Sequence, residues 1–255
     1  MRIGFSITVR MKSTRLQKKA MLKINGREIL AIMIERLRLC KLLDEIIVAT
    51  SINKDDVILC DLAKRENVRC FRGSEDDVLE RLYLAGMKYK IDYLLNLTAD
   101  CPLVAFDFIE KMVEKYKESN ADLITISKLP HGFYFWGMKM PALKKVIEIK
   151  KGNDTEVWIR YFTDTGLFKL ADVEVPKEFQ RANYRLSVDY REDYEFFKAL
   201  FGEMGRDTHL KPTKDIINFL DAHPEIVKIN ENCEKLYKKR WQSQNKLLLK
   251  KQTII

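Results

Sequence analysis

Short apolar runs alternate with longer amphipathic segments through the first half of the chain. The apolar runs predict strands at Ile3–Val9, Glu45–Thr50, Val68–Phe71, Asp92–Leu97 and Asp122–Ile126. Apolar residues at helical spacing between them predict helices over Leu30–Leu39, Asp55–Glu66, Ser74–Lys88 and Phe108–Tyr116. Strands that alternate with helices are typical of parallel βαβ units with right-handed crossovers. We therefore predict a doubly wound, mostly parallel α/β sheet flanked by helices.

The alternation breaks after Pro130, where the aromatic-rich segment 131–140 is expected to be extended. Further helices are predicted over Leu143–Ile149, Glu156–Phe162, Arg191–Met204, Thr213–Ala222 and Glu231–Lys250, and strands over Phe168–Val173 and Tyr184–Val188. We expect one domain over residues 1–230, with halves 1–129 and 130–230, and the second half is a smaller subdomain that completes the same sheet. Residues 231–255 are expected to form a basic helix or tail.

The composition fits a folded protein in a reducing cytosol. Hydrophobic residues make up 46% of the 255 positions, enough to bury a sizeable core. The N-terminal apolar run is far too short to span a membrane and lacks the layout of a signal peptide, so we expect a cytoplasmic protein. The five cysteines are an odd number without C-x-x-C spacing, which disfavours a zinc site or a disulfide framework: Cys40, Cys60, Cys70, Cys101 and Cys233.

The net charge of +9 is unevenly placed. Residues 1–27 contain eight Lys or Arg and no acid, and residues 231–255 contain seven Lys or Arg against two Glu. A basic patch attracts polyanions without saying which kind. The simpler interpretation of the basic tail is a solvated helical face. No nucleic-acid motif is recognisable, so a nucleic-acid-binding module is disfavoured.

The loop Arg10–Lys19 holds five cations in ten residues, directly after the first predicted strand. In open α/β sheets, ligands bind beyond the carboxyl ends of the strands. A triphosphate there needs cations, backbone N–H groups and hydroxyl donors, and this loop has all three. The alternative is a solvated basic loop. The residues match neither a P-loop nor a dinucleotide-binding glycine motif, which removes the usual support for an ATPase or a dehydrogenase.

Two aspartates follow predicted strands. Asp100, in the segment Leu97–Leu103, is well placed to hold a divalent cation beside phosphates, although it could equally be a turn residue or a cap. Asp189 ends a second apolar run, where it is either another metal ligand or the N-cap of the next helix. The local pattern alone favours the cap.

Taken in order, these segments resemble the CMP-sugar-acid synthetase group, and most of all its spore-coat-polysaccharide cytidylyltransferase branch. The family pattern A-R-x-G-S-x-R-L-P-x-K reads V-R-M-K-S-T-R-L-Q-K-K here. The segment Thr98–Leu103 resembles the family's T-G-D-C-P-L, and Val188–Asp193 resembles its V-D-x-x-E-D. Segments 43–51 and 68–81 also match closely, and the likeness extends from residue 1 to about residue 230.

The resemblance implies a GT-A-like, Rossmann-type fold, and an Mg²⁺-dependent transfer of CMP from CTP to a sugar acid, with release of pyrophosphate. Residues 1–129 would bind the nucleotide and 130–230 the acceptor. The residues that this implies for the nucleotide are Arg10, Lys12, Ser13, Arg15, Lys19, Ala49, Thr50, Ser51, Arg72, Gly73, Ser74 and Thr98. Asp100 and Asp189 would hold magnesium, with Arg15 and Lys19 neutralising the pyrophosphate. The relatives in this group also suggest a homodimer.

The predicted acceptor site is formed by His131, Gly132 and Glu156, and here the chain departs from the family. Val157 replaces the His of the usual E-H-V-T, and His131 replaces a Pro; in the loop, Lys12 replaces a Gly. No general base is evident. His131 is a candidate to bind the acceptor carboxylate or to help deprotonate the acceptor, and the alternative is a surface or packed residue without a direct role. These departures leave open an unusual acceptor or an inactive paralogue that scaffolds a glycan pathway. A GT-A glycosyltransferase is the other alternative, although D-C-P stands where its D-x-D is usual.

Overall fold

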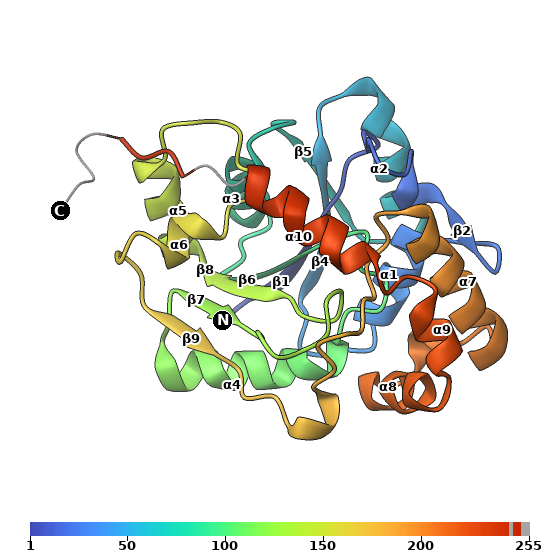
Figure 1. The fold of residues 1–255 in the computed structure, drawn as a ribbon. Helices are drawn as coiled ribbons and strands as arrows, with labels where there is room; N and C mark the ends of the chain where they lie inside the picture. Colours follow the sequence, from blue (N-terminus) through green and yellow to red (C-terminus); the bar gives the residue numbers. More distant parts are fainter. Residues whose placement is uncertain (245–246, 251–255) are drawn as a thin grey trace.

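A seven-stranded sheet forms the centre of the computed structural model, which describes residues 1–244 and 247–250, and helices cover both faces of the sheet (Figure 1). The strand order across the sheet is β5-β4-β1-β6-β8-β7-β9. In chain order the strands are β1 (Ile3–Thr8), β4 (Glu45–Ser51), β5 (Arg69–Gly73), β6 (Tyr93–Thr98), β7 (Leu123–Thr125), β8 (Trp136–Lys139) and β9 (Leu170–Asp172). A separate small hairpin joins β2 (Lys23–Ile24) to β3 (Arg27–Glu28).

The sheet is parallel except at β8, which lies antiparallel between β6 and β7. This strand comes from the aromatic segment that was expected to be extended. Gly137 allows β8 to lie against β6, because a Cβ at this position would lie 2.2 Å from the Tyr93 hydroxyl oxygen. The predicted fold class, a mostly parallel α/β sheet flanked by helices, is confirmed.

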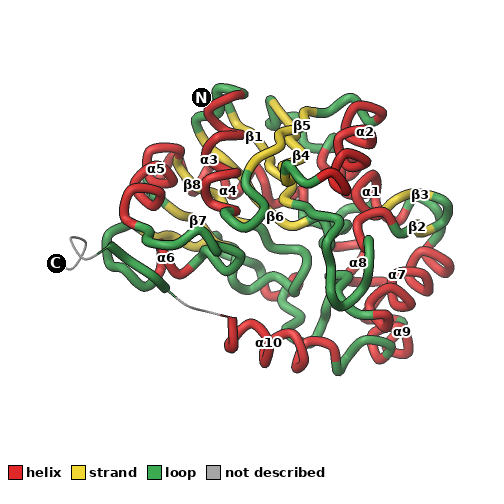
Figure 2. Tube along the Cα trace, turned by 90° about the horizontal axis from the view of Figure 1, so that it is seen from above, coloured by secondary structure: helices red, strands yellow, loops and turns green. Residues whose placement is uncertain are grey.

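Helices lie on both faces of the sheet, and the last helix lies apart from the sheet at one side of the molecule (Figure 2). The helices are α1 (Ile29–Leu37), α2 (Val57–Arg65), α3 (Val78–Lys88), α4 (Ile109–Ser119), α5 (Met140–Ile149), α6 (Arg160–Thr163), α7 (Arg191–Met204), α8 (Thr213–Ala222), α9 (Pro224–Lys228) and α10 (Cys233–Gln244). Ile46 and Val48 of β4 pack into the cluster that contains α1 and α2, whereas Ile47 packs with α3 and α5. Burial on both faces explains why the strands read as continuous apolar runs.

Three predicted elements are wrong. Tyr184–Val188 is not a strand: its contact is an isolated bridge between His131 and Arg185, and the Val188 N–H donates to the Asp100 carbonyl (2.7 Å) instead of a ladder partner. Only the end of the helix predicted over 156–162 forms, as α6. The last helix ends at Gln244, and Leu249 then pairs with Lys150 after α5. Two parts of the predicted helix and tail lie outside the described residues, namely 245–246 and 251–255.

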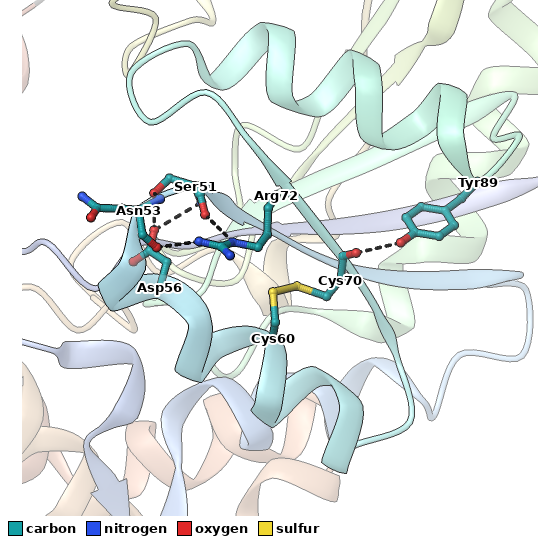
Figure 3. The surroundings of a disulfide bond; sticks show 7 residues. All are labelled: Ser51, Asn53, Asp56, Cys60, Cys70, Arg72 and Tyr89. Atoms are coloured by element: carbon teal, nitrogen blue, oxygen red, sulfur yellow. Dashed lines mark hydrogen bonds between the residues drawn. A yellow bond between two sulfur atoms is a disulfide. The ribbon is translucent and has the colours of Figure 1, made fainter.

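Cys60 on α2 and Cys70 on β5 form a disulfide (Figure 3). The expectation against disulfides is therefore wrong for this pair, and cysteine usage no longer argues for a reducing compartment. The packing of α2 on β5 brings the two Cα atoms within 5.5 Å, which neither the odd number of cysteines nor their spacing reveals. The other three cysteines are free.

No helix among the described residues combines the length and the apolar character that a membrane span needs.

Candidate functional site

A cavity of 470 Å³ lies where β1 and β6 end, and we call it the loop cavity. The loop after β1 forms one wall through Arg10, Lys12, Ser13, Arg15 and Lys19. Thr98, the last residue of β6, and Asp100, two residues later, also line this cavity. The strong positive charge of the loop therefore faces a cavity at the carboxyl edge of the sheet, where this kind of fold binds ligands.

A second cavity of 620 Å³ adjoins it, and we call it the aromatic cavity. Its lining includes five large aromatic side chains: Tyr134, Trp136, Trp158, Tyr237 and Trp241. The rings of Trp136 and Trp158 lie 5.2 Å apart in an edge-to-face arrangement. Flat, rigid walls of this kind suit a ring-shaped ligand that has both apolar and polar edges.

The two cavities share a junction. The residues that line both are Arg15, Thr98, Asp100, Glu156, Trp158 and Arg240. A ligand in the loop cavity and a ligand in the aromatic cavity would therefore meet beside Asp100. This arrangement suits a transfer reaction between two bound molecules, because it holds their reacting ends together.

Lys19 joins the two predicted metal ligands. Its ammonium contacts the Asp100 carboxylate and lies 2.7 Å from Oδ1 of Asp189. Asp100 and Asp189 are 89 positions apart in the sequence, yet the structure brings them to one cation. The local reason is that each follows the end of an extended segment, and the Val188 N–H binds the Asp100 carbonyl.

Asp189 is buried and is held as a carboxylate. Its Oδ1 also lies 2.6 Å from Arg15, and its Oδ2 lies 2.7 Å from Arg185. Burial alone would raise the pKa of Asp189, but the charges of Lys19, Arg15 and Arg185 outweigh it and hold the pKa well below its usual value. Conversely, burial lowers the pKa of Lys19 while Asp100 and Asp189 raise it, and the net shift is upward.

The helix-cap alternative for Asp189 is wrong. Tyr190 is the N-cap of α7, and the carboxylate of Asp193 accepts the N–H groups of Asp189 (2.9 Å) and Tyr190 (3.0 Å). The side chain of Asp189 is free of that structural task and faces the loop cations. The local pattern misled because either aspartate could fill the first turn.

Behind Asp189 lies a buried arginine that sequence reasoning missed. Arg185 is 2% exposed and contacts Asp189, Asp193 (3.0 Å) and Glu234 (2.9 Å). Burial would lower the pKa of Arg185, but these carboxylates raise it. The signal that could have pointed to it is an Arg four positions before the Asp of the V-D motif, inside an apolar run.

Six of the residues predicted to border the nucleotide line neither cavity: Ala49, Thr50, Ser51, Arg72, Gly73 and Ser74. The first three are buried at the end of β4. Arg72 donates to the carbonyls of Ser51 (3.0 Å) and Asn53 (2.7 Å), as Figure 3 shows. These contacts give the segments a structural role at the end of β4. The likeness of a segment to a motif does not reveal which way its side chains point.

Of the predicted acceptor residues, His131 and Glu156 line the aromatic cavity, whereas Gly132 does not. Gly132 has a positive φ of 96°, and a Cβ there would lie 2.1 Å from the Leu186 carbonyl oxygen. It is therefore needed for the close approach of two backbone segments. Glu156 lies 3.6 Å from Arg10, so it also touches the loop.

Helix α10 closes the aromatic cavity and corrects the interpretation of the tail as a solvated face. Six of its side chains line that cavity: Glu234, Tyr237, Lys238, Arg240, Trp241 and Gln242. Glu234 lies 2.7 Å from Nδ1 of His131, and the rings of Tyr237 and His131 are 4.5 Å apart. Tyr237 and Trp241 are four residues apart, a spacing that indicates a packed face of a helix. The high content of basic residues had instead favoured a solvated face.

The lowered pKa of Glu234 predicts that the stability of the fold depends on pH. Burial raises its pKa, but His131 and Arg185 outweigh burial and lower the pKa from 4.5 to about 2. A carboxyl whose pKa is lower in the folded than in the unfolded protein stabilises the fold fully at a pH above its pKa in the unfolded protein. This contribution disappears as the pH falls from about 4.5 toward 2. We expect Glu234→Gln to lose less stability than the parent on acidification, by on the order of 2 kcal/mol, in urea unfolding at a series of pH values. The control is Glu231→Gln, at an exposed site, and the same acid dependence in Glu234→Gln and the parent would contradict the prediction.

Known proteins share this sequence and fold. Residues 6–253 match the model of a family described as cytidylyltransferase. Uncharacterized protein MJ1063 of Methanocaldococcus jannaschii is 35% identical over 234 residues, which cover 91% of this chain and 96% of the relative. The spore coat polysaccharide biosynthesis protein SpsF of Bacillus subtilis is 28% identical over 88% of this chain and 95% of its own length.

Among solved structures, a cytidylyltransferase from Leptospira borgpetersenii superposes with a TM-score of 0.81 at 28% identity, covering 89% of this chain and 97% of that one. The resemblance that the sequence motifs indicate is confirmed by these matches. They agree with the fold, in which a cationic loop follows β1 and acidic residues gather at the carboxyl edge of the sheet. The chain belongs to the cytidylyltransferase family and is a nucleotidyltransferase.

Proposed function

We propose that this nucleotidyltransferase joins CMP from CTP to a sugar acid, with Mg²⁺ and with release of pyrophosphate, for the synthesis of a surface polysaccharide. The observation that carries the proposal is the junction, where a cationic cavity for a triphosphate meets an aromatic cavity beside Asp100. The name of SpsF, which concerns spore coat polysaccharide, is consistent with such a product for that relative. We also propose a homodimer, which rests on the family resemblance alone, and a cytoplasmic location, which rests on the sequence expectation alone.

The residues present fit a magnesium ion. No cluster of three or more His, Cys, Asp or Glu side chains that could hold a metal occurs within residues 1–244 and 247–250, so the protein alone would not enclose the ion. Mg²⁺, however, is usually bound through one or two carboxylates together with substrate phosphates and water. Asp100 and Asp189 supply two such carboxylates, and Lys19 between them marks a place that accommodates positive charge. Bound there, the ion would neutralise charge on the α-phosphate.

The chain's own residues would bind and orient the reactants. Arg10, Lys12 and Ser13 would hold the triphosphate along the loop, and Arg15 and Lys19 would neutralise the departing pyrophosphate. An acceptor oxygen then attacks the α-phosphorus as the bond to pyrophosphate breaks. Such transfer depends mainly on positioning and on neutralising charge.

The aromatic cavity suits a sugar acid. Trp136 and Trp158 would offer apolar ring surface to a sugar, and the exposed Lys238 would offer a cation to its acid group. His131 and Glu156, which line the same cavity, offer hydrogen bonds to hydroxyl groups.

The test is a pyrophosphate-release screen of the four nucleoside triphosphates against a panel of sugar acids and neutral sugar phosphates. We expect release with CTP, only with an acid, and only when Mg²⁺ is present; a chelator should abolish it. Equal use of all four nucleotides would contradict the preference for CTP. Release without any acid acceptor, or no release with any pair, would refute the proposed reaction.

A further inference from the structure

We propose that helix α10 completes the nucleotide site, and that Arg240 on this helix binds the triphosphate of CTP. The inference rests on the proposed placement of CTP in the loop cavity. It assigns a binding role to a helix that lies after the last recognised motif, Val188–Asp193, but within the residues that match the family model. The charged group that Arg240 would recognise is a phosphate oxygen.

The position of Arg240 carries the argument. Its side chain lines the loop cavity together with Lys12, Arg15 and Lys19, and also lines the aromatic cavity. Its Nη1 donates to the hydroxyl of Thr14, within the loop, over 3.2 Å. The guanidinium therefore already lies against the segment that would hold the phosphates. A planar guanidinium suits phosphate because it can donate two parallel hydrogen bonds.

The helix that carries Arg240 is firmly anchored at its start. Glu234 binds the buried Arg185 (2.9 Å), and the ring of Tyr237 lies 5.1 Å from the Arg185 guanidinium carbon. Positions 234, 237 and 241 fall on one face of a helix, the face that lines the aromatic cavity. Arg240 follows six residues after Glu234, or about 9 Å along the axis, which carries it to the junction.

The other cations of α10 show that this placement is selective. Lys235 and Lys239 are exposed and line neither cavity, and Lys238 is exposed and lines the aromatic cavity alone, whereas Arg240 is half-buried and lines both. A general attraction between a basic helix and a nucleotide would involve these lysines equally. Lys239 precedes Arg240 directly, so it provides a control with the same change of charge at nearly the same place.

The experiment is calorimetric titration of CTP, and separately of CMP, into the full chain with Mg²⁺. We expect Arg240→Ala to weaken CTP binding by about tenfold or more, as the loss of a charge-assisted contact implies. CMP lacks the two outer phosphates, so its binding should change much less. Arg240→Lys should restore part of the CTP affinity, and Lys239→Ala should bind both ligands as the parent does.

Parental CTP affinity in Arg240→Ala would overturn the inference, as would an equal loss in Lys239→Ala. An equal loss of CTP and CMP affinity would also overturn it, because the contact would not then be with the outer phosphates. If the alanine variant fails to fold, Arg240→Lys replaces it in the test, because it keeps the charge and should still bind CTP more weakly than the parent. A parent that does not bind CTP would refute the proposed function together with the inference, whereas a parent that binds CTP unaffected by Arg240 refutes the inference alone.

Discussion

Asp189→Asn is expected to lower turnover by about two to three orders of magnitude while leaving the protein folded and able to bind CTP. The carboxylate would be a ligand of the ion that neutralises the α-phosphate, and an amide cannot supply that charge. Asp100→Asn should have the same effect. CTP affinity measured without metal should stay level or rise, because Lys19 and Arg15 would lose a competing carboxylate.

Turnover is to be measured by pyrophosphate release at saturating Mg²⁺, and CTP binding by calorimetry with and without the metal. Asp215→Asn is the matched control, since Asp215 is exposed on α8 and lines neither cavity. Parental turnover in a folded Asp189→Asn protein would exclude a metal role for this residue. Because the structure already removes the cap role, that result would leave Asp189 only as an ion-pair partner of Arg15, Lys19 and Arg185.

Arg185→Met is expected to destabilise the fold by about 3–5 kcal/mol. Arg185 is the buried cation between Asp189, Asp193 and Glu234, and its removal takes a cationic partner from all three carboxylates at once. A buried charge that loses its partner costs far more than the pair itself contributes. Urea unfolding at neutral pH measures the change in the free energy of unfolding.

The control is Arg181→Met. Arg181 binds both carboxylate oxygens of Asp221 but at the surface, where an ion pair contributes no more than about 1 kcal/mol. The two substitutions remove the same chemical group, so the difference between them measures burial. Similar losses from both variants would show that the Arg185 network is not a main support of the fold.

The first half of the fold could be predicted from the sequence because its signals are local. A strand buried on both faces must be a continuous apolar run, and β1, β4 and β6 lie within a residue or so of their predicted bounds. The positions of Arg15, Lys19 and Asp100 at one edge follow from the same logic, since the parallel strands β1 and β6 bring their carboxyl ends together. Asp189 reaches the same edge from an extended segment outside the sheet, through the bond between the Val188 N–H and the Asp100 carbonyl. The family motif added their expected roles.

Other features depended on contacts between distant segments. The apolar run Tyr184–Val188 is extended, yet the N–H groups of Leu186 and Val188 go to His131 and Asp100, which no local pattern specifies. The pairing of Cys60 with Cys70 depended on how α2 packs on β5. Arg72 belongs to a segment that matches the family, but the direction of its side chain depended on a hydrogen bond to a carbonyl of β4.

By itself, the sequence determined the strands of the sheet, the cationic loop and the two candidate aspartates, because burial and strand direction can be predicted from short runs of residues. The tertiary structure alone decided that α10 forms a wall of the site. A count of charges describes the composition of a helix, whereas the partner of each side chain depends on the surface that the helix meets. In this protein that surface presents His131 and Arg185 to Glu234, and the phosphate loop to Arg240.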